Sequence, residues 1–203
     1  MDPSETVHVI DDDEAVRLSI KFLLETEGLT VASYEGADSF LGKPAPSAGC
    51  ILTDFHMPGL DGLELQTLLR ERQISLPLIV MTGFGDVPAA VRAMKGGAVD
   101  FLEKPFADGA LLAAVRRALE TDRQRREAAT AKAVATRRIA LLTPREREVL
   151  ALLAQGHGNK DMARILGTSP RTIDVHRARV YQKLDVDSLP DLVRLVIAAG
   201  AAE

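Results

Sequence analysis

Several short apolar runs in the first half of the sequence end in side chains that can do chemistry. These side chains are Asp11, Asp12, Asp54, Thr82 and Lys104. Adjacent carboxylates repel one another, and a bound cation would relieve that repulsion. Hard oxygen ligands with positions left open for water suit Mg²⁺. A hydroxyl and an ammonium beside such a cation are the groups that an incoming phosphoryl group needs.

The elements that must position these side chains alternate between strands and helices. Strands are expected at 7–11, 30–34, 50–54, 77–82 and 98–104, and helices at 14–28, 37–42, 61–72, 86–97 and from about 107. This alternation predicts an open, doubly wound α/β fold with a five-stranded parallel sheet and helices on both faces. Ligands of such sheets bind outside the carboxyl ends of the strands, so the five side chains should meet on one rim.

The second half of the sequence has a different character. No Gly or Pro occurs between Ala110 and Thr143, and most of 107–139 is expected to be helical. Thr143, Pro144 and Glu146 then form a capping-box pattern that begins a new helix. Further helices are expected at 159–166, 170–184 and 188–199. We therefore expect a domain at 1–120, a helical linker at 121–140 and an all-α domain at 141–203.

Charge is distributed unevenly between the halves. Residues 1–120 carry a net charge of −9 and residues 121–203 a net charge of +5. An acidic half could hold a cation, and a basic half could meet phosphate backbones.

The cysteine content and the hydropathy of the sequence limit where in the cell the protein is expected to be. The single cysteine, Cys50, excludes an internal disulfide framework and is expected to serve packing alone. No run approaches the length of a membrane span, and the N-terminal residues lack the pattern of a secretory signal. We expect a cytoplasmic protein with no membrane partner.

Residues 159–184 have the pattern of two helices joined by a tight turn at Gly167. Ser169 and Pro170 begin the second helix. Its buried stripe is expected to contain Ile173, His176, Val180 and Leu184. A mixed polar face bordered by cations is typical of the recognition helix of a helix-turn-helix. The candidate DNA-binding residues are Lys160, Ser169, Arg171, Thr172, Asp174, Val175, Arg177, Ala178, Arg179 and Lys183.

Residues 7–120 resemble the receiver domain of two-component response regulators. The acidic pair, the Asp that precedes "FHMPGLDG", the "TG" at 82–83 and "DFLEKPF" (100–106) carry the resemblance. It implies a flavodoxin-like fold in which Asp54 takes a phosphoryl group from a phosphohistidine on a sensor histidine kinase. Lys104 and Thr82 would contact the phosphoryl oxygens, and the rotamer of Phe101 would follow Thr82.

The same resemblance implies a cofactor, Mg²⁺ or Mn²⁺. Asp12, Asp54 and the backbone carbonyl of His56 would bind the ion directly, and Asp11 would help through water. It also implies a cis bond between Lys104 and Pro105.

Residues 142–200 resemble the LuxR/FixJ-type four-helix DNA-binding domain. "LTPREREVL", "NKDMA", "SPRTIDVHR" and "KL" are the matching segments, and residues 81–106 strengthen a similarity of the whole chain to FixJ-type response regulators. The resemblance implies a regulator, expected to be an activator, that forms a homodimer on phosphorylation. Double-stranded operator DNA and RNA polymerase would be its other partners.

Position 174 departs from the wider family, in which it is often basic. Asp174 could accept a hydrogen bond from a cytosine amino group, or Arg171 or Arg177 could hold it in a structural role. The DNA sequence preference therefore cannot be transferred from the family.

Several residues near the candidate sites have simpler expected roles. Asp13 is expected to be a solvated helix cap, the His56 side chain to face solvent, and His176 to be a core histidine with satisfied hydrogen bonds.

Two other functions remain open from the residues alone. A Mg²⁺-dependent phosphotransfer enzyme would use Asp54 as its nucleophile, although no second acid or base follows it directly, and we expect no turnover enzyme. An adaptor would use the basic domain to bind an acidic protein or RNA.

Overall fold

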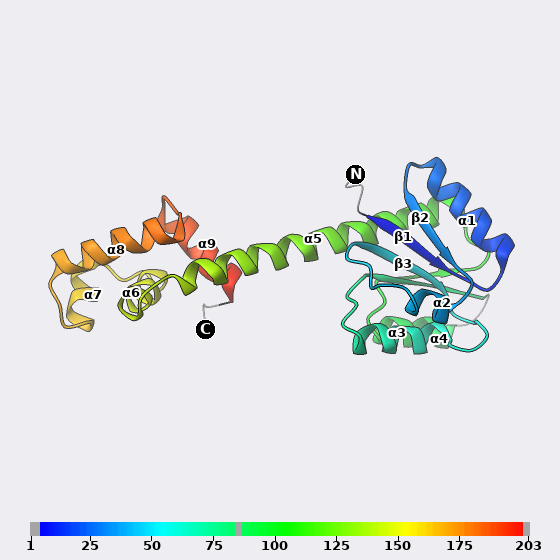
Figure 1. Ribbon diagram of the computed structural model, residues 1–203, viewed down its shortest axis with the longest axis horizontal. Helices are drawn as coiled ribbons and strands as arrows, with labels where there is room; N and C mark the ends of the chain where they lie inside the picture. The colour runs from blue at the N-terminus through cyan, green and yellow to red at the C-terminus, as the bar shows by residue number, and fades with distance from the viewer. Residues whose placement is uncertain (1–4, 84–86, 201–203) are drawn as a thin grey trace. The chain divides into compact units, whose positions relative to one another are not determined.

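The structure is a computed structural model, and it describes residues 5–83 and 87–200. The strands are β1 (Thr6–Ile10), β2 (Thr30–Tyr34), β3 (Gly49–Asp54), β4 (Leu78–Thr82) and β5 (Asp100–Glu103). They form one sheet in the order β2-β1-β3-β4-β5, and every pairing is parallel (Figure 1). The predicted doubly wound parallel sheet is confirmed.

Helices cover both faces of the sheet. The helices of this half of the chain are α1 (Glu14–Thr26), α2 (Ala37–Leu41), α3 (Gly62–Glu71), α4 (Val87–Lys95) and α5 (Asp108–Ala140). One hydrophobic core joins α1 and α5 to the sheet, and a second core joins α2, α3 and α4 to its other face. Every residue of β3 and β4 is buried because both faces are covered.

Local signals in the sequence explain where the helices begin. The Asp13 carboxylate accepts hydrogen bonds from the backbone N–H groups of Ala15 (2.8 Å) and Val16 (3.3 Å), which confirms its predicted role as a cap. Asp61 and Glu64 form a reciprocal capping box at the start of α3. Residue 86, where the fourth helix was predicted to begin, lies outside the described residues.

A buried carboxylate ties α5 to the start of the central strand. Gly49 has φ +121, and a Cβ there would lie 1.9 Å from the backbone oxygen of Thr6. Its N–H donates to Asp122 Oδ2 at 3.0 Å. The Asp122 side chain is fully buried, and its Oδ1 accepts from Arg125 Nη2 at 2.7 Å. Asp122 therefore satisfies a buried backbone donor while Arg125 balances its charge.

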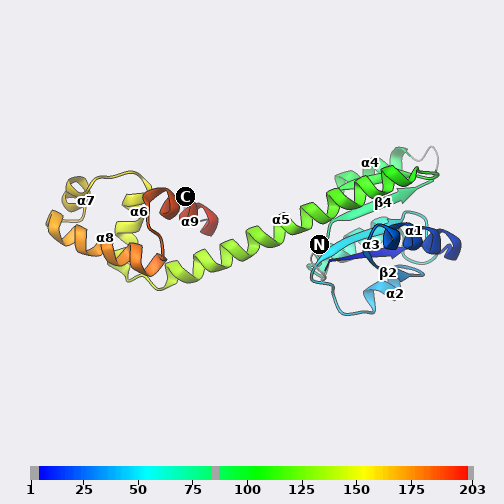
Figure 2. The ribbon, with the colours of Figure 1, turned by 90° about the horizontal axis from the view of Figure 1, so that it is seen from above.

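The described helices of the second half are α6 (Pro144–Ala154), α7 (Asn159–Ile165), α8 (Pro170–Leu184) and α9 (Leu189–Ala199). Thr143 and Glu146 form the expected capping box at the start of α6. Figure 2 shows α7 and α8 as consecutive helices joined by a short turn. Their buried side chains form a separate core, and the chain divides into two compact units between Arg125 and Arg126.

Candidate functional site

Three of the predicted side chains meet at the carboxyl ends of the strands. Lys104 Nζ lies 2.8 Å from Asp11 Oδ2 and 2.6 Å from Asp54 Oδ1. Asp11 follows β1, Asp54 ends β3 and Lys104 follows β5, so three separate strands contribute to the contact. The parallel topology brings them together because all three strands end at the same edge.

The shared ammonium and partial burial set the ionisation of this cluster. Burial raises the pKa of Asp54 above its ordinary value, and its hydrogen bond with Lys104 only partly offsets the effect. Burial disfavours the Lys104 ammonium, but its hydrogen bonds with Asp11 and Asp54 outweigh this and raise the pKa of Lys104. The lysine therefore stays charged beside the two carboxylates.

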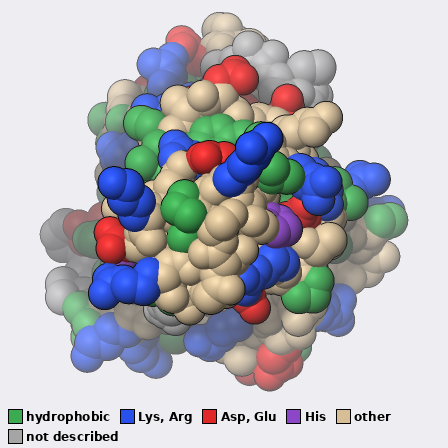
Figure 3. All heavy atoms as spheres, turned by 90° about the vertical axis from the view of Figure 1, so that its left-hand side faces the viewer, with side chains coloured by type: hydrophobic (Ala, Val, Ile, Leu, Met, Phe, Trp, Pro, Cys, Tyr) green, Lys and Arg blue, Asp and Glu red, His purple; other side chains and the backbone are tan. Residues whose placement is uncertain are grey.

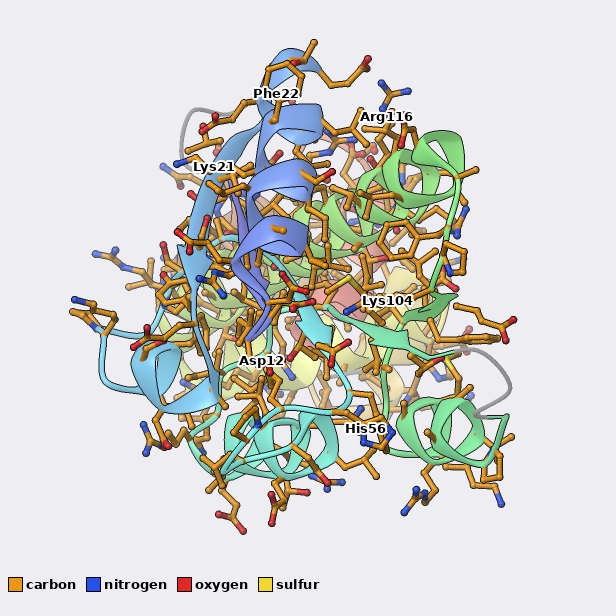
Figure 4. All side chains as sticks on the ribbon, turned by 90° about the vertical axis from the view of Figure 1, so that its right-hand side faces the viewer. Asp12, Lys21, Phe22, His56, Lys104 and Arg116 are labelled. Atoms are coloured by element: carbon orange, nitrogen blue, oxygen red, sulfur yellow. The ribbon has the colours of Figure 1, made fainter. Side chains whose placement is uncertain are left out.

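Asp12 and His56 lie around the same edge of the sheet, as Figure 4 shows. The Asp12 side chain is exposed, and no hydrogen-bond or ion-pair partner is found for it within residues 5–83 and 87–200. The backbone N–H of His56 donates to Asp54 Oδ2 at 3.1 Å. Its imidazole is exposed, as predicted, and lies edge-on to Phe55 with 4.6 Å between ring centroids.

The donor set at this edge fits Mg²⁺. Among the described residues no group of three or more His, Cys, Asp and Glu side chains is arranged to hold a metal ion. The implied set needs fewer side chains, because Mg²⁺ keeps several waters and is usually held by one or two carboxylates. The Lys104 ammonium contacts the carboxylates of Asp11 and Asp54, and Asp12 adds a third carboxylate at the same edge, so the charge balance also favours a divalent cation.

Thr82 and Phe101 differ sharply in exposure. Thr82 is 2% exposed, whereas Phe101 is 44% exposed. Both line a cavity of about 280 Å³, together with described residues of α4 and β5, namely Ala90, Val91, Met94, Lys95 and Glu103. The aromatic ring therefore points outward beside an apolar space large enough to receive a side chain.

Two smaller expectations for the first half of the sequence are confirmed. The Lys104–Pro105 peptide bond is cis. Cys50 is fully buried, and burial raises the pKa of its thiol to about 12, with the Asp122 and Glu5 carboxylates adding to the effect. A buried thiol with this pKa is inert, which fits a packing role.

The second unit presents the predicted helix-turn-helix. Ser169 Oγ accepts from the backbone N–H of Thr172 at 3.1 Å and contacts its hydroxyl at 2.9 Å, so both hydroxyls serve the start of α8. Ile173, Val180 and Leu184 are buried as predicted. His176 differs from the expected satisfied core histidine, because it is half-buried and its Nδ1 has no hydrogen-bond partner among the described residues. Most of the predicted contacts are exposed, namely Lys160, Ser169, Arg171, Thr172, Asp174, Val175, Ala178 and Arg179, whereas Arg177 and Lys183 are half-buried.

Basic side chains are spread over the face that Figure 3 turns to the viewer. Hydrophobic and acidic side chains stand between them. The surface is therefore a mixed one with several cations rather than a uniform basic patch.

Asp174 is held by a residue that the sequence analysis did not single out. Asn159 Nδ2, at the start of α7, donates a hydrogen bond to Asp174 Oδ1. Asn159 Oδ1 accepts from Arg177 Nη1 at 3.0 Å, and the Arg177 guanidinium carbon lies 5.6 Å from the centre of the Tyr181 ring. Helical spacing within α8 indicated the arginine but could not reveal a partner on another helix.

Lys183 is placed differently from our expectation of a DNA contact. Its Nζ lies 2.7 Å from Glu146 Oε2 and 3.3 Å from the backbone oxygen of Leu141. The Glu146 side chain is only 3% exposed. Lys183 thus balances a buried carboxylate at the start of α6, and we leave it out of the proposed DNA contacts.

Comparisons with known families agree with both halves of this structure. Residues 7–116 match the response regulator receiver domain, and residues 140–196 match the luxR family of bacterial regulatory proteins. The chain therefore belongs to the two-component response regulators that join a receiver domain to a LuxR-type DNA-binding domain.

Two FixJ transcriptional regulators are similar to this chain over nearly their whole length. The transcriptional regulatory protein FixJ of Azorhizobium caulinodans is 51% identical over 203 residues, covering 100% of this chain and 96% of that protein. FixJ of Rhizobium meliloti is 45% identical over 200 residues, with 96% of each chain covered.

Solved structures give the same result. The response regulator StyR matches with a TM-score of 0.81 and 40% identity, covering 95% of this chain and 98% of that one. Full-length FixJ from B. japonicum matches with a TM-score of 0.61 and 47% identity, covering 98% of each chain.

No helix in residues 5–83 and 87–200 is long and apolar enough to cross a membrane.

Proposed function

We propose that Asp54 is the phosphoacceptor of this response regulator. A carboxylate oxygen of Asp54 attacks the phosphorus of a phosphohistidine on a sensor histidine kinase. The new bond joins that oxygen to phosphorus, and the bond between phosphorus and the histidine nitrogen breaks. The contact of Lys104 Nζ with Asp54 Oδ1, at 2.6 Å, is the observation that carries this proposal.

The surrounding residues stabilise the transferred group. Lys104 is already charged beside Asp54, and after the transfer its ammonium contacts a phosphoryl oxygen. The Thr82 hydroxyl donates a hydrogen bond to another of these oxygens. Asp12, Asp54 and the carbonyl of His56 would hold Mg²⁺, with Asp11 acting through water. The ion, when bound, neutralises the negative charge of the phosphoryl group.

Phosphorylation would change the surface of α4, β5 and α5. Movement of Thr82 toward the phosphoryl group opens space for Phe101 to turn into the neighbouring cavity. Two receivers would then pair through a surface that includes the partly exposed side chains of Met94 (42% exposed) and Val99 (38% exposed).

A homodimer would carry two DNA-binding domains to two operator half-sites, where it regulates transcription together with RNA polymerase. Arg171, Val175 and Ala178 would face the major groove, and Lys160 and Arg179 would contact phosphates. Because the luxR family consists of bacterial regulatory proteins, and bacterial DNA lies in the cytoplasm, we propose that the protein acts there.

The acceptor assignment is tested with the full chain, Mg²⁺ and acetyl phosphate as the phosphodonor. Intact-mass measurement should show one added phosphoryl group on the wild type and on Asp61→Asn, which changes a capping carboxylate in the same loop. Asp54→Asn should gain none, because an amide cannot form the acyl phosphate. Labelling of Asp54→Asn at the wild-type level would overturn the assignment.

The same reaction separates a regulator from an enzyme. We expect phosphoryl uptake of one equivalent followed by slow loss, and dimerisation and operator binding that follow the phosphorylated fraction. Rapid repeated hydrolysis of the phosphodonor would favour the phosphotransfer enzyme instead. A salt-dependent shift with duplex DNA but not with RNA would exclude the adaptor.

A further inference from the structure

The recognition helix carries an acidic side chain on the face that should approach DNA. Asp174 is exposed and lies one turn from Arg171 and from Ala178. A carboxylate there repels phosphates unless it accepts a hydrogen bond from a cytosine or is held by groups of the protein itself. The contacts of Asp174 decide between these roles.

Asp174 belongs to a chain of three side chains that leaves α8 and returns to it. The carboxylate accepts from the Asn159 amide nitrogen, and the Asn159 amide oxygen accepts from Arg177 Nη1 at 3.0 Å. The two partners demand opposite ends of the amide, because a carboxylate only accepts hydrogen bonds and a guanidinium only donates them. Asn159 is therefore oriented from both sides.

Arg177 is restrained on a second side as well. Its guanidinium carbon lies 5.6 Å from the centre of the Tyr181 ring, one turn further along α8. An arginine held by both a hydrogen bond and an aromatic face loses less side-chain entropy when it binds a phosphate. Arg177 is half-buried, and the N–H groups of its guanidinium other than the one bound to Asn159 have no hydrogen-bond partner among the described residues.

We propose that Asp174 reads no base and that Asn159 is a positioning residue, which holds Arg177 ready for a phosphate of duplex DNA. This inference rests on the proposed DNA-binding function. Sequence preference then comes from Arg171, Val175 and Ala178, while the Asp174–Asn159–Arg177 chain contributes affinity that is the same for every sequence.

The test uses the phosphorylated full-length protein and a duplex that the wild type selects from a random pool. Affinities are measured for single-base variants of that duplex at several salt concentrations. Arg177→Ala should weaken binding to all variants by the same factor and lower the salt slope by about 0.9 per half-site, or about 1.8 for the dimer. Asn159→Ala should weaken binding in the same uniform way, and it should add little in the Arg177→Ala background.

Lys160→Ala is the matched control, because Lys160 is the exposed neighbour of Asn159 and makes no contact with Arg177 within the described residues. Its loss should add fully to that of Arg177→Ala. Asp174→Ala should change all single-base variants equally. A loss of preference of roughly fivefold or more at one base pair would overturn the proposal.

A second measurement does not depend on DNA. The NMR signals of the Asn159 side-chain amide should shift in both Asp174→Ala and Arg177→Ala, while the folded spectrum is otherwise retained. If the wild type binds no duplex, the proposed function fails. The NMR signals still test whether Asp174, Asn159 and Arg177 are hydrogen-bonded to one another. An Asn159 amide that is unchanged in Asp174→Ala would overturn it.

Discussion

The acidic edge of the receiver and the exposed face of α8 place their charged side chains by different physical means. At the edge, three residues lie at the ends of three strands, and Lys104 Nζ is within 2.8 Å of a carboxylate oxygen of both Asp11 and Asp54. On α8, Asp174 and Arg177 lie one turn apart, yet the structure links them through Asn159 of α7. Strand ends converge because the sheet is parallel, whereas a helix face only says which way a side chain points.

This difference explains which predictions were accurate. Asp11, Asp54 and Lys104 were predicted to lie together and are found in contact, because the topology of the strand ends allows few arrangements. Residues on a helix face were identified without their partners, because a partner on another helix has no periodic relation to them. Lys183 is the clearest case, since the same spacing that suggested a DNA contact also allows its ion pair with Glu146.

The largest effect is expected where three strands share one ammonium. Lys104→Ala should retain partial phosphorylation of Asp54 but lose phosphorylation-dependent dimerisation, because the ammonium that would contact the phosphoryl oxygens is gone. Intact mass and light scattering after treatment with acetyl phosphate measure the two properties. Lys21→Ala, which removes an exposed lysine of α1, should behave as the wild type. Normal dimerisation of phosphorylated Lys104→Ala would reduce Lys104 to a structural ion-pair partner.

The corresponding test in the second unit concerns the buried carboxylate of Glu146. Its hydrogen bonds with Lys183 and with the backbone N–H of Thr143 lower its pKa from 4.5 to about 2. Since the folded pKa lies below the unfolded one, this stabilisation is complete above about pH 4.5 and is lost as the pH falls toward 2. The loss should be at most about 3 kcal/mol.

Glu146→Gln should remove this part of the acid sensitivity. Hydrogen exchange in α6 and α8, followed between pH 5 and pH 2, measures it within the second unit. Glu148→Gln is the control, because Glu148 forms an exposed ion pair with Arg145 on the same helix. Equal acid sensitivity in wild type and Glu146→Gln would show that Lys183 is free to contact DNA after all.

A buried carboxylate also occurs in the receiver, at the end of the sheet opposite Asp54. Asp122→Ala leaves the buried N–H of Gly49 without its acceptor and should lower the free energy of unfolding by about 2 kcal/mol. Urea unfolding followed by circular dichroism measures the change. Glu120→Ala removes an exposed ion pair with Arg123 on the same helix and should cost under about 0.5 kcal/mol. Similar losses in the two variants would mean that Asp122 does not anchor α5.

Much of the fold and of the acidic edge could be predicted from the sequence, for reasons that particular residues show. Apolar runs such as 50–54 predict buried strands, and Thr143 with Glu146 predicts the start of a helix, because both signals are local in the sequence. Neither Asp122 with Gly49 nor Asn159 with Asp174 was predicted. Each pair joins residues far apart in sequence through one hydrogen bond, and no spacing rule encodes such a contact.

The smallest effect should come from Asp13, the third of three adjacent carboxylates. Asp11 pairs with Lys104, and the Asp12 carboxylate is exposed at the rim, but Asp13 turns to the first N–H groups of α1. Asp13→Ala should therefore cost about 1 kcal/mol in the free energy of unfolding and leave phosphorylation of Asp54 intact. Asp13→Asn should restore most of the stability, because asparagine caps helices about as well as aspartate. Urea unfolding and intact mass measured on the same samples separate the two properties. A loss of phosphorylation in Asp13→Asn would make Asp13 part of the phosphorylation site. The cap hydrogen bonds seen in the structure would then not account for its role.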